Sequence, residues 1–132
     1  MIAPGASMVD EKRLFVAVVD DDESVRESLP DLLRALGYEA QAFASAQEFL
    51  ESGCVGKAHC LILDIAMPGM SGPELQRHLR RQHPSLPIVF ITAHGNGSVR
   101  AALREKGAAE VLFKPFNAQD LRAALELALR PP

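Results

Sequence analysis

Cysteine, contiguous basic residues and long apolar runs are all scarce in this chain of 132 residues. The two cysteines, Cys54 and Cys60, have no metal-ligand spacing and follow no secretory signal, so we expect reduced, structural thiols in a cytoplasmic protein. The apolar stretches are too short to span a bilayer, so no membrane is expected as a partner. The net charge of −3 and the scattered basic residues give no electrostatic reason to expect a nucleic acid partner.

The rest of the composition is that of an ordinary soluble domain, with 48% hydrophobic and 23% charged residues. A chain of this length can bury the core of one compact domain. We expect residues 1–13 to be a disordered leader, because small and charged residues mix there without periodicity. Residues 14–130 are expected to form the domain. Residues 131–132 are prolines, which cannot continue a helix, and are expected to be a tail or a truncated linker.

From Leu14 onward, short apolar runs alternate with segments of helical periodicity. This pattern predicts an α/β fold in which five parallel strands are covered on both faces by five helices. Pro30 falls inside the first helix, where it removes a backbone donor, so a kink or a displaced first turn is expected. Helix ends are predicted from stop and cap residues: Gly37, Gly107, Asn117, and the capping-box pairs Ser45 with Glu48 and Ser71 with Glu74.

Four of the apolar runs stop at residues suited to phosphoryl chemistry. These residues are the triplet Asp20, Asp21 and Asp22, and then Asp64, Thr92 and Lys114. Ligands of open parallel sheets bind beyond the carboxyl ends of the strands, so we expect these side chains to meet at one edge. Carboxylates so close together need a cation, and Mg²⁺ is the obvious candidate because it favours carboxylate oxygen. One acid of the triplet is surplus, and Asp22 is expected to be the helix-start acid.

Four segments match one known family in order and spacing: residues 18–26, 63–72, 91–95 and 114–116. Over residues 14–129 the chain therefore resembles the receiver domain of two-component response regulators, and most of all the receivers of nitrogen-fixation-type regulators. The resemblance implies a chemotaxis-regulator-like, flavodoxin-like fold. That fold is a doubly wound five-stranded parallel sheet of order 2-1-3-4-5 with five helices.

The resemblance also implies a function, which is to accept a phosphoryl group and switch conformation to control an output. Asp64 would take that group from a phosphohistidine of a sensor histidine kinase. The chain would be no enzyme beyond its own phosphorylation and dephosphorylation. The other implied roles are Mg²⁺ binding by Asp20, Asp21, Asp64 and the Ala66 backbone carbonyl, a phosphoryl contact from Lys114, and a phosphoryl hydrogen bond from Thr92.

The chain departs from the family at its switch and beside the phosphoryl position. The family usually has an aromatic residue at position 111, where Val111 is a stiff side chain without comparable rotation. We therefore expect output through displacement of the loop over residues 92–98 and the following helix, without an aromatic gate. Ala66 and His94 occupy positions that affect water access, and small Ala66 is expected to leave a path open. The resemblance also implies a cis peptide bond before Pro115.

Two alternatives from other classes stay open. A haloacid-dehalogenase-like phosphatase would use Asp20 as its nucleophile, but it would need a further acidic pair and would leave Asp64 unexplained. A pseudo-receiver would bind partners without being phosphorylated. Taken singly, Asp64 could be a turn acid, Thr92 an ordinary strand residue and Lys114 a surface lysine.

Exposed charges are expected on the fourth and fifth helices. They include Arg100, Arg104, Glu105, Arg122 and Glu126. Relatives use these helices as a dimer or output face, which favours a phosphorylation-dependent homodimer through helices 4 and 5. A solvated charged face is equally compatible with the residues.

Overall fold

The computed structural model describes residues 13–130, and five parallel strands form the centre of this region. Their order is β2-β1-β3-β4-β5, as the resemblance implied. The strands are β1 (Phe15–Val19), β2 (Glu39–Phe43), β3 (Cys60–Asp64), β4 (Ile88–Thr92) and β5 (Glu110–Phe113). The expected leader over residues 1–13, apart from Arg13, and the expected tail over residues 131–132 lie outside the described residues.

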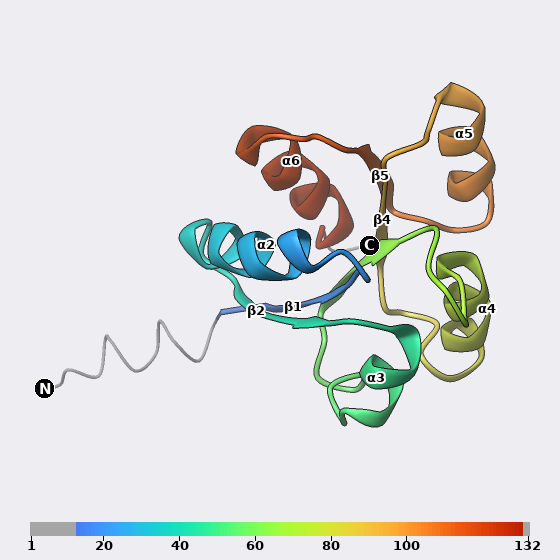
Figure 1. The fold of residues 1–132 in the computed structure, drawn as a ribbon, viewed down its shortest axis with the longest axis horizontal. Coiled ribbons are helices and arrows are strands. Elements are labelled where there is room, and N and C mark those ends of the chain that lie inside the picture. Colours follow the sequence, from blue (N-terminus) through green and yellow to red (C-terminus); the bar gives the residue numbers. More distant parts are fainter. Residues whose placement is uncertain (1–12, 131–132) are drawn as a thin grey trace, which may run out of the picture.

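Helices cover both faces of the sheet (Figure 1). They are α2 (Glu23–Ala35), α3 (Ala46–Glu51), α4 (Gly72–Gln82), α5 (Gly97–Glu105) and α6 (Ala118–Ala128). On one face, α2 and α6 contribute Leu33 and Leu125 to a core with β1 and β3. On the other face, Phe49 of α3 and Leu75 of α4 pack beside the same strands. The doubly wound arrangement is confirmed. Within residues 13–130, no helix has the length and apolarity to cross a membrane.

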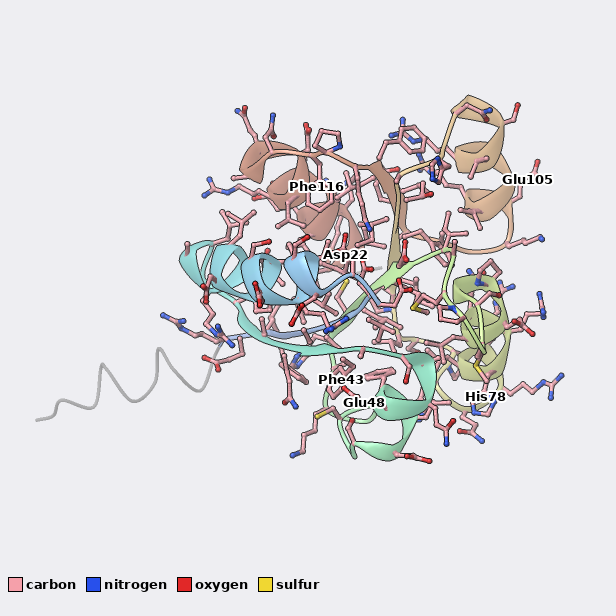
Figure 2. All side chains as sticks on the ribbon, viewed as in Figure 1. Asp22, Phe43, Glu48, His78, Glu105 and Phe116 are labelled. Carbon is pink, nitrogen blue, oxygen red and sulfur yellow. The ribbon has the colours of Figure 1, made fainter. Side chains whose placement is uncertain are left out.

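The central strands are buried on both faces, which explains why they read as continuous apolar runs. Every residue of β3 and β4 is buried. By contrast β2, at the edge of the sheet, exposes Glu39 and Gln41. Its last residue, Phe43, lies beside α3 with its ring centroid 5.4 Å from that of Phe49 (Figure 2). β3 and β4 end in Asp64 and Thr92, which are both buried. The sheet therefore holds polar side chains in a buried position at the edge formed by the carboxyl ends of its strands.

Most helix boundaries follow the predicted caps. Ser71 and Glu74 form a complete capping box at α4, in which the Ser71 N–H donates to the Glu74 carboxylate at 2.9 Å. The second predicted box is only half formed. The Ser45 hydroxyl accepts the Glu48 N–H at 3.0 Å, but the Glu48 carboxylate accepts the Ala44 N–H instead of that of Ser45. The partner of the Glu48 carboxylate is therefore the N–H one residue earlier in the chain than predicted.

The predicted glycine stops and the last cap are confirmed. Gly37 and Gly107 follow α2 and α5 with φ of 101° and 103°, a left-handed conformation that favours glycine. Asn117 begins α6, where its side chain accepts the Asp120 N–H at 2.7 Å. Gly37 and Gly107 thus set where α2 and α5 end, and Asn117 sets where α6 begins.

Pro30 lies inside α2 without shifting its start. The helix begins at Glu23, directly after its cap Asp22, so the expected displaced first turn is wrong. An interior proline costs roughly 3 kcal/mol. Burying a leucine contributes about 1.5–3 kcal/mol, and Pro30 is itself buried together with Leu29 and Leu33 on the sheet side of the helix. This apolar burial keeps the helix continuous through the proline.

Candidate functional site

The carboxyl ends of four strands bring their polar residues to one edge of the sheet. Asp20 follows β1, Asp64 ends β3, Thr92 ends β4 and Lys114 follows β5. The Lys114 ammonium nitrogen lies 2.9 Å from Asp20 Oδ2 and 3.7 Å from Asp64 Oδ1. Residues from opposite ends of the sequence are thus in direct contact, where the topology of a parallel sheet predicted them.

Asp20 is the most enclosed member of this group, with no exposed surface. One carboxylate oxygen accepts the Asp22 N–H at 2.9 Å, and the other accepts a hydrogen bond from Lys114. Its backbone carbonyl accepts from Arg26 Nη1 at 3.0 Å. A buried carboxylate needs such partners, because an unpaired buried charge is strongly unfavourable.

Asp64 lies beside Asp20 and is 7% exposed. Burial raises the pKa of Asp64 from 3.8 to about 6, and the charges of Asp20 and Asp21 act in the same direction. Lys114 and the Ile65 N–H oppose the rise without cancelling it. The raised pKa of Asp64 therefore reflects burial first and the neighbouring carboxylates second.

Lys114 is the cation of the cluster. Its burial lowers the pKa of its ammonium group, but the hydrogen bond to Asp20 and the charges of Asp20 and Asp64 outweigh burial. The net result is a pKa raised above the ordinary lysine value. Lys114 is therefore protonated at neutral pH and holds a fixed positive charge between two carboxylates.

The acidic residues meet the requirements of a divalent cation site. Carboxylate oxygens of Asp20, Asp21 and Asp64 all lie within 4.8 Å of one another. Three carboxylates face one ammonium group, so negative charge remains to be compensated. Oxygen donors of this kind suit Mg²⁺, which usually keeps several waters, and the exposed Asp21 leaves a side open to them. Ala66, in the loop after β3, is exposed beside this edge.

Asp22 stands apart from the cluster, as expected of the surplus acid. Its carboxylate caps α2 by accepting the Ser24 N–H at 2.9 Å and the Ser24 hydroxyl at 2.8 Å. These hydrogen bonds lower the pKa of Asp22 below its ordinary value. The prediction that Asp22 is the helix-start acid is confirmed.

Thr92 is 5% exposed and bonds within its own loop. Its hydroxyl oxygen accepts the His94 N–H at 3.1 Å. A hydroxyl both accepts and donates, so the Thr92 hydrogen remains available to a further acceptor. His94 itself is exposed, and so is Ala66 on the neighbouring loop. Of these two exposed positions, position 66 carries only a methyl group.

The remaining predicted residues lie under or beside the site. The Lys114–Pro115 peptide bond is cis, as the resemblance implied. Val111 has no exposed surface and belongs to the core on the α3, α4 and α5 side of the sheet. Two residues farther along β5, the half-buried Phe113 occupies the same face.

Sequence reasoning missed two residues that support the site. Arg26, one turn into α2, holds the Asp20 carbonyl, and an arginine at that spacing after the acidic triplet was the only signal for it. Gly72 begins α4 directly against the end of β3. A Cβ there would overlap the Asp64 carbonyl oxygen and lie 3.0 Å from Ile65 Cα. No pattern along the chain announces this close approach.

Comparisons with known proteins point to one family. Residues 16–126 match the profile described as the response regulator receiver domain. The chain is 41% identical over 116 residues to Nodulation protein W of Bradyrhizobium diazoefficiens, covering 88% of this chain and 51% of the relative. It is 36% identical over 116 residues to the transcriptional regulatory protein FixJ of Azorhizobium caulinodans, covering 88% and 55%. The chain thus spans about half the length of these curated relatives.

Solved structures agree with the sequence comparisons. The fold superposes on the low-resolution structure of the response regulator StyR with a TM-score of 0.79 and 47% sequence identity. This match covers 89% of the chain and 60% of the StyR chain. The comparisons do not support the phosphatase alternative. That alternative would use Asp20 as its nucleophile. In the structure, both carboxylate oxygens of Asp20 already accept hydrogen bonds, one from Lys114 and one from the Asp22 N–H.

Proposed function

Because the chain belongs to the response regulator receiver domain family, and is thus a receiver of two-component response regulators, we propose that Asp64 accepts a phosphoryl group from a sensor histidine kinase. The observation that carries this proposal is the contact of Lys114 with both Asp20 and Asp64 inside a cluster of carboxylates. The arrangement places one reactive carboxylate beside a lysine ammonium group, and beside carboxylates that would hold a cation.

In the proposed step, an oxygen of Asp64 forms a bond to phosphorus. The bond from phosphorus to the kinase histidine nitrogen breaks, and the nitrogen keeps the electron pair. With a pKa of about 6, Asp64 is ionised in most molecules at neutral pH and is able to attack. Asp20, Asp21, Asp64 and the Ala66 backbone carbonyl would hold Mg²⁺, which supplies positive charge beside the phosphoryl oxygens.

Lys114 and Thr92 then act on the product. The Lys114 ammonium is 3.7 Å from Asp64 Oδ1, so it is placed to contact a phosphoryl oxygen on that carboxylate. The Thr92 hydroxyl donates its free hydrogen to the same group, which shifts the loop that carries His94. Ala66 and His94 flank the phosphoryl group, small Ala66 leaves water a path to it, and its hydrolysis restores the resting state. A local charge change of this kind biases a two-state element.

The proposal extends to where and with what the chain works. It is a signalling module, with no catalysis beyond its own phosphorylation and dephosphorylation, and it works in the cytoplasm. Its partners are the sensor histidine kinase and, once the chain is phosphorylated, a second copy of the chain. The second copy binds through α5 and α6, which are the fourth and fifth helices of the sequence prediction. The chain contacts neither nucleic acid nor membrane itself.

Incubation with acetyl phosphate and Mg²⁺, followed by intact-mass measurement, tests the assignment of Asp64. We expect one added phosphoryl group on the parent chain and none on Asp64→Asn. Asp22→Asn is the matched control, because Asp22 caps α2 outside the carboxylate cluster, and it is expected to gain the group like the parent. A phosphoryl group on Asp64→Asn, or none on the parent, would remove the proposal.

A further inference from the structure

The start of α5 is held to the rest of the molecule by few contacts. Leu103 is its one buried residue, while Val99 is only partly buried. The C-terminal end is anchored, because the buried Gln76 of α4 donates to the Lys106 carbonyl at 3.3 Å. Arg100 is therefore the main polar tie between the start of the helix and the sheet.

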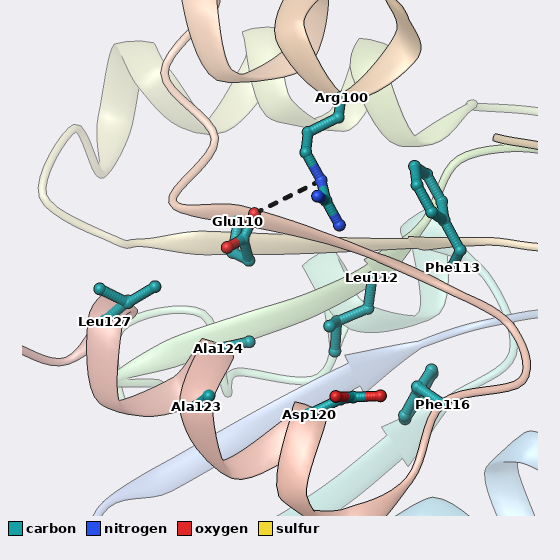
Figure 3. Close-up of a pocket in the computed structure, with 9 residues that line it drawn as sticks. All are labelled: Arg100, Glu110, Leu112, Phe113, Phe116, Asp120, Ala123, Ala124 and Leu127. Atoms are coloured by element: carbon teal, nitrogen blue, oxygen red, sulfur yellow. Dashed lines mark ion pairs between the residues drawn. The ribbon is translucent and has the colours of Figure 1, made fainter. Parts of the chain in front are cut away.

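Arg100 reaches β5 in three ways. Its Nη2 donates to the Val111 carbonyl at 3.1 Å, on the free side of an edge strand. Its Nε lies 3.8 Å from the Glu110 carboxylate (Figure 3). Its guanidinium carbon lies 4.9 Å from the centre of the Phe113 ring, within the range of a cation–π contact. The Phe113 ring is thus one of the surfaces that locates α5.

The same ring lies against the loop that follows Thr92 at the end of β4. Thr92 and Phe113 are paired in register on neighbouring strands, so their side chains share one face of the sheet. A Cβ on Gly95 would overlap the Phe113 ring and lie 2.9 Å from Thr92 Cγ2. Glycine at position 95 is what lets the ring lie against this loop, since any larger residue would displace it.

We propose that Phe113 is a positioning residue that couples the Thr92 side chain to Arg100, and through Arg100 to the start of α5. In the resting chain the Thr92 hydroxyl accepts the His94 N–H, and the ring lies close to both Gly95 and the guanidinium group. When Thr92 turns toward a modified Asp64, the contact with the loop changes and the ring moves away from Arg100. The inference rests on the proposed function and differs from the sequence hypothesis, which considered position 111 alone.

Fluorine NMR on the full chain, labelled with 4-fluorophenylalanine at its six phenylalanines, tests this coupling. Phe113→Leu identifies the Phe113 resonance by its loss, and Phe113→Tyr does so if the leucine variant does not fold. Mg²⁺ and beryllofluoride, a phosphoryl mimic, are then added. We expect the Phe113 resonance to shift on binding, and the shift to be lost in Thr92→Val, which keeps the side-chain volume without the hydroxyl.

Arg100→Gln and Arg104→Gln form a matched pair for the second half of the coupling. Both arginines lie on α5 within 4 Å of the Glu110 carboxylate, but only Arg100 stacks on Phe113. We expect Arg100→Gln to move the resting Phe113 resonance and Arg104→Gln to leave it in place. An unmoved resonance in Arg100→Gln overturns the coupling.

The fluorine signal of bound beryllofluoride distinguishes a failure of the coupling from a failure of the proposed function. A bound signal with an unmoved Phe113 resonance overturns the coupling and leaves the proposed function intact. Absence of a bound signal counts against the proposed function. The comparison of Arg100→Gln with Arg104→Gln in the resting chain then shows whether the Phe113 ring contacts the Arg100 guanidinium group.

Discussion

Asp64 combines two requirements that oppose each other. It is buried where it meets Asp20 and Lys114, yet in the proposed reaction it must be ionised to attack phosphorus. Burial and the neighbouring carboxylates raise its pKa from 3.8 to about 6. Between these two pH values the folded chain holds a proton that the unfolded chain has released. Folding therefore becomes less favourable as the pH rises through this interval, and the site is built at the expense of stability.

Asp64→Asn removes this charge and should stabilise the metal-free chain. In EDTA near neutral pH, we expect the free energy of unfolding to rise by on the order of 2 kcal/mol, allowing for screening at the open edge. Below about pH 4 the gain should vanish, because Asp64 is then protonated in both folded and unfolded parent chains. Urea denaturation followed by circular dichroism measures both values.

Asp22→Asn provides a control of opposite sign. The pKa of Asp22 is lowered by its hydrogen bonds to Ser24, so its ionised form stabilises the folded chain. The variant should lose stability near neutral pH under the same conditions. A loss of stability in Asp64→Asn as well would contradict the account of charge repulsion at the site.

Ala66 offers a second test of a single side chain. If its small size leaves water a path to the phosphoryl group, Ala66→Arg should slow dephosphorylation about threefold or more, a change in barrier below 1 kcal/mol at the lower limit. Gln82→Arg, which adds the same charge at the far end of α4, controls for the charge itself. Phosphoprotein decay is followed by intact mass, and equal rates for Ala66→Arg and the parent would remove the claim.

Helices and strands act on the site through their ends. The capping box at Ser71 starts α4 immediately after the loop from β3, and Gly72 lets the first turn touch the Asp64 backbone. A Cβ at position 72 would also lie 3.1 Å from Phe90 Cε1. Because backbone cannot yield as a flexible side chain can, the space at this helix start determines how α4 approaches β3.

Gly72→Ala should therefore destabilise the chain by about 1–3 kcal/mol through overpacking. Gly97→Ala is the matched control, because Gly97 also begins a helix but a Cβ there meets nothing within 4 Å. Alanine at position 97 should be neutral or stabilising by up to about 1 kcal/mol. Chemical denaturation of both variants measures the difference, and equal effects would show that contact with the Asp64 backbone is not the cause.

At the scale of the whole molecule, the homodimer proposed through α5 and α6 would use a surface that includes exposed apolar atoms. Among residues 13–130, Leu127 of α6 is the one large apolar side chain that is strongly exposed, at 45%. It borders a hollow formed by α5, β5 and α6, with Phe113 and Phe116 in its lining (Figure 3). Charges of both signs surround this hollow, including Arg100, Glu110 and Asp120. The proposed contact with a second copy would pair these opposite charges across a two-fold axis and cover the apolar atoms.

Light scattering on the size-fractionated chain tests this face. With Mg²⁺ and beryllofluoride we expect the mass of a dimer, and without them that of a monomer. Leu127→Asp should prevent the dimer, whereas Gln47→Asp on the outer surface of α3 should not. A monomer under both conditions, or a dimer that Leu127→Asp leaves unchanged, would contradict the proposal.

The strands, the helix caps and the meeting of Asp20, Asp64 and Lys114 could be predicted from the chain alone. Each depends on a periodicity or a cap that acts over a few residues, or on the general rule that parallel strands end at one edge. The surplus role of Asp22 was also readable, because a helix-start acid is a local feature.

What could not be predicted depends on distances between segments far apart in sequence. The Arg100 contact with Phe113, the loop packing allowed by Gly95 and the tight start of α4 at Gly72 exist because particular helices come to rest against particular strands. The raised pKa of Asp64 likewise comes from burial in the packed structure and then from the Asp20 and Asp21 carboxylates, which follow another strand. Strand and helix periodicity and helix caps depend on residues near one another in the sequence. Burial, charge repulsion and steric fit depend on how distant segments pack in the folded molecule.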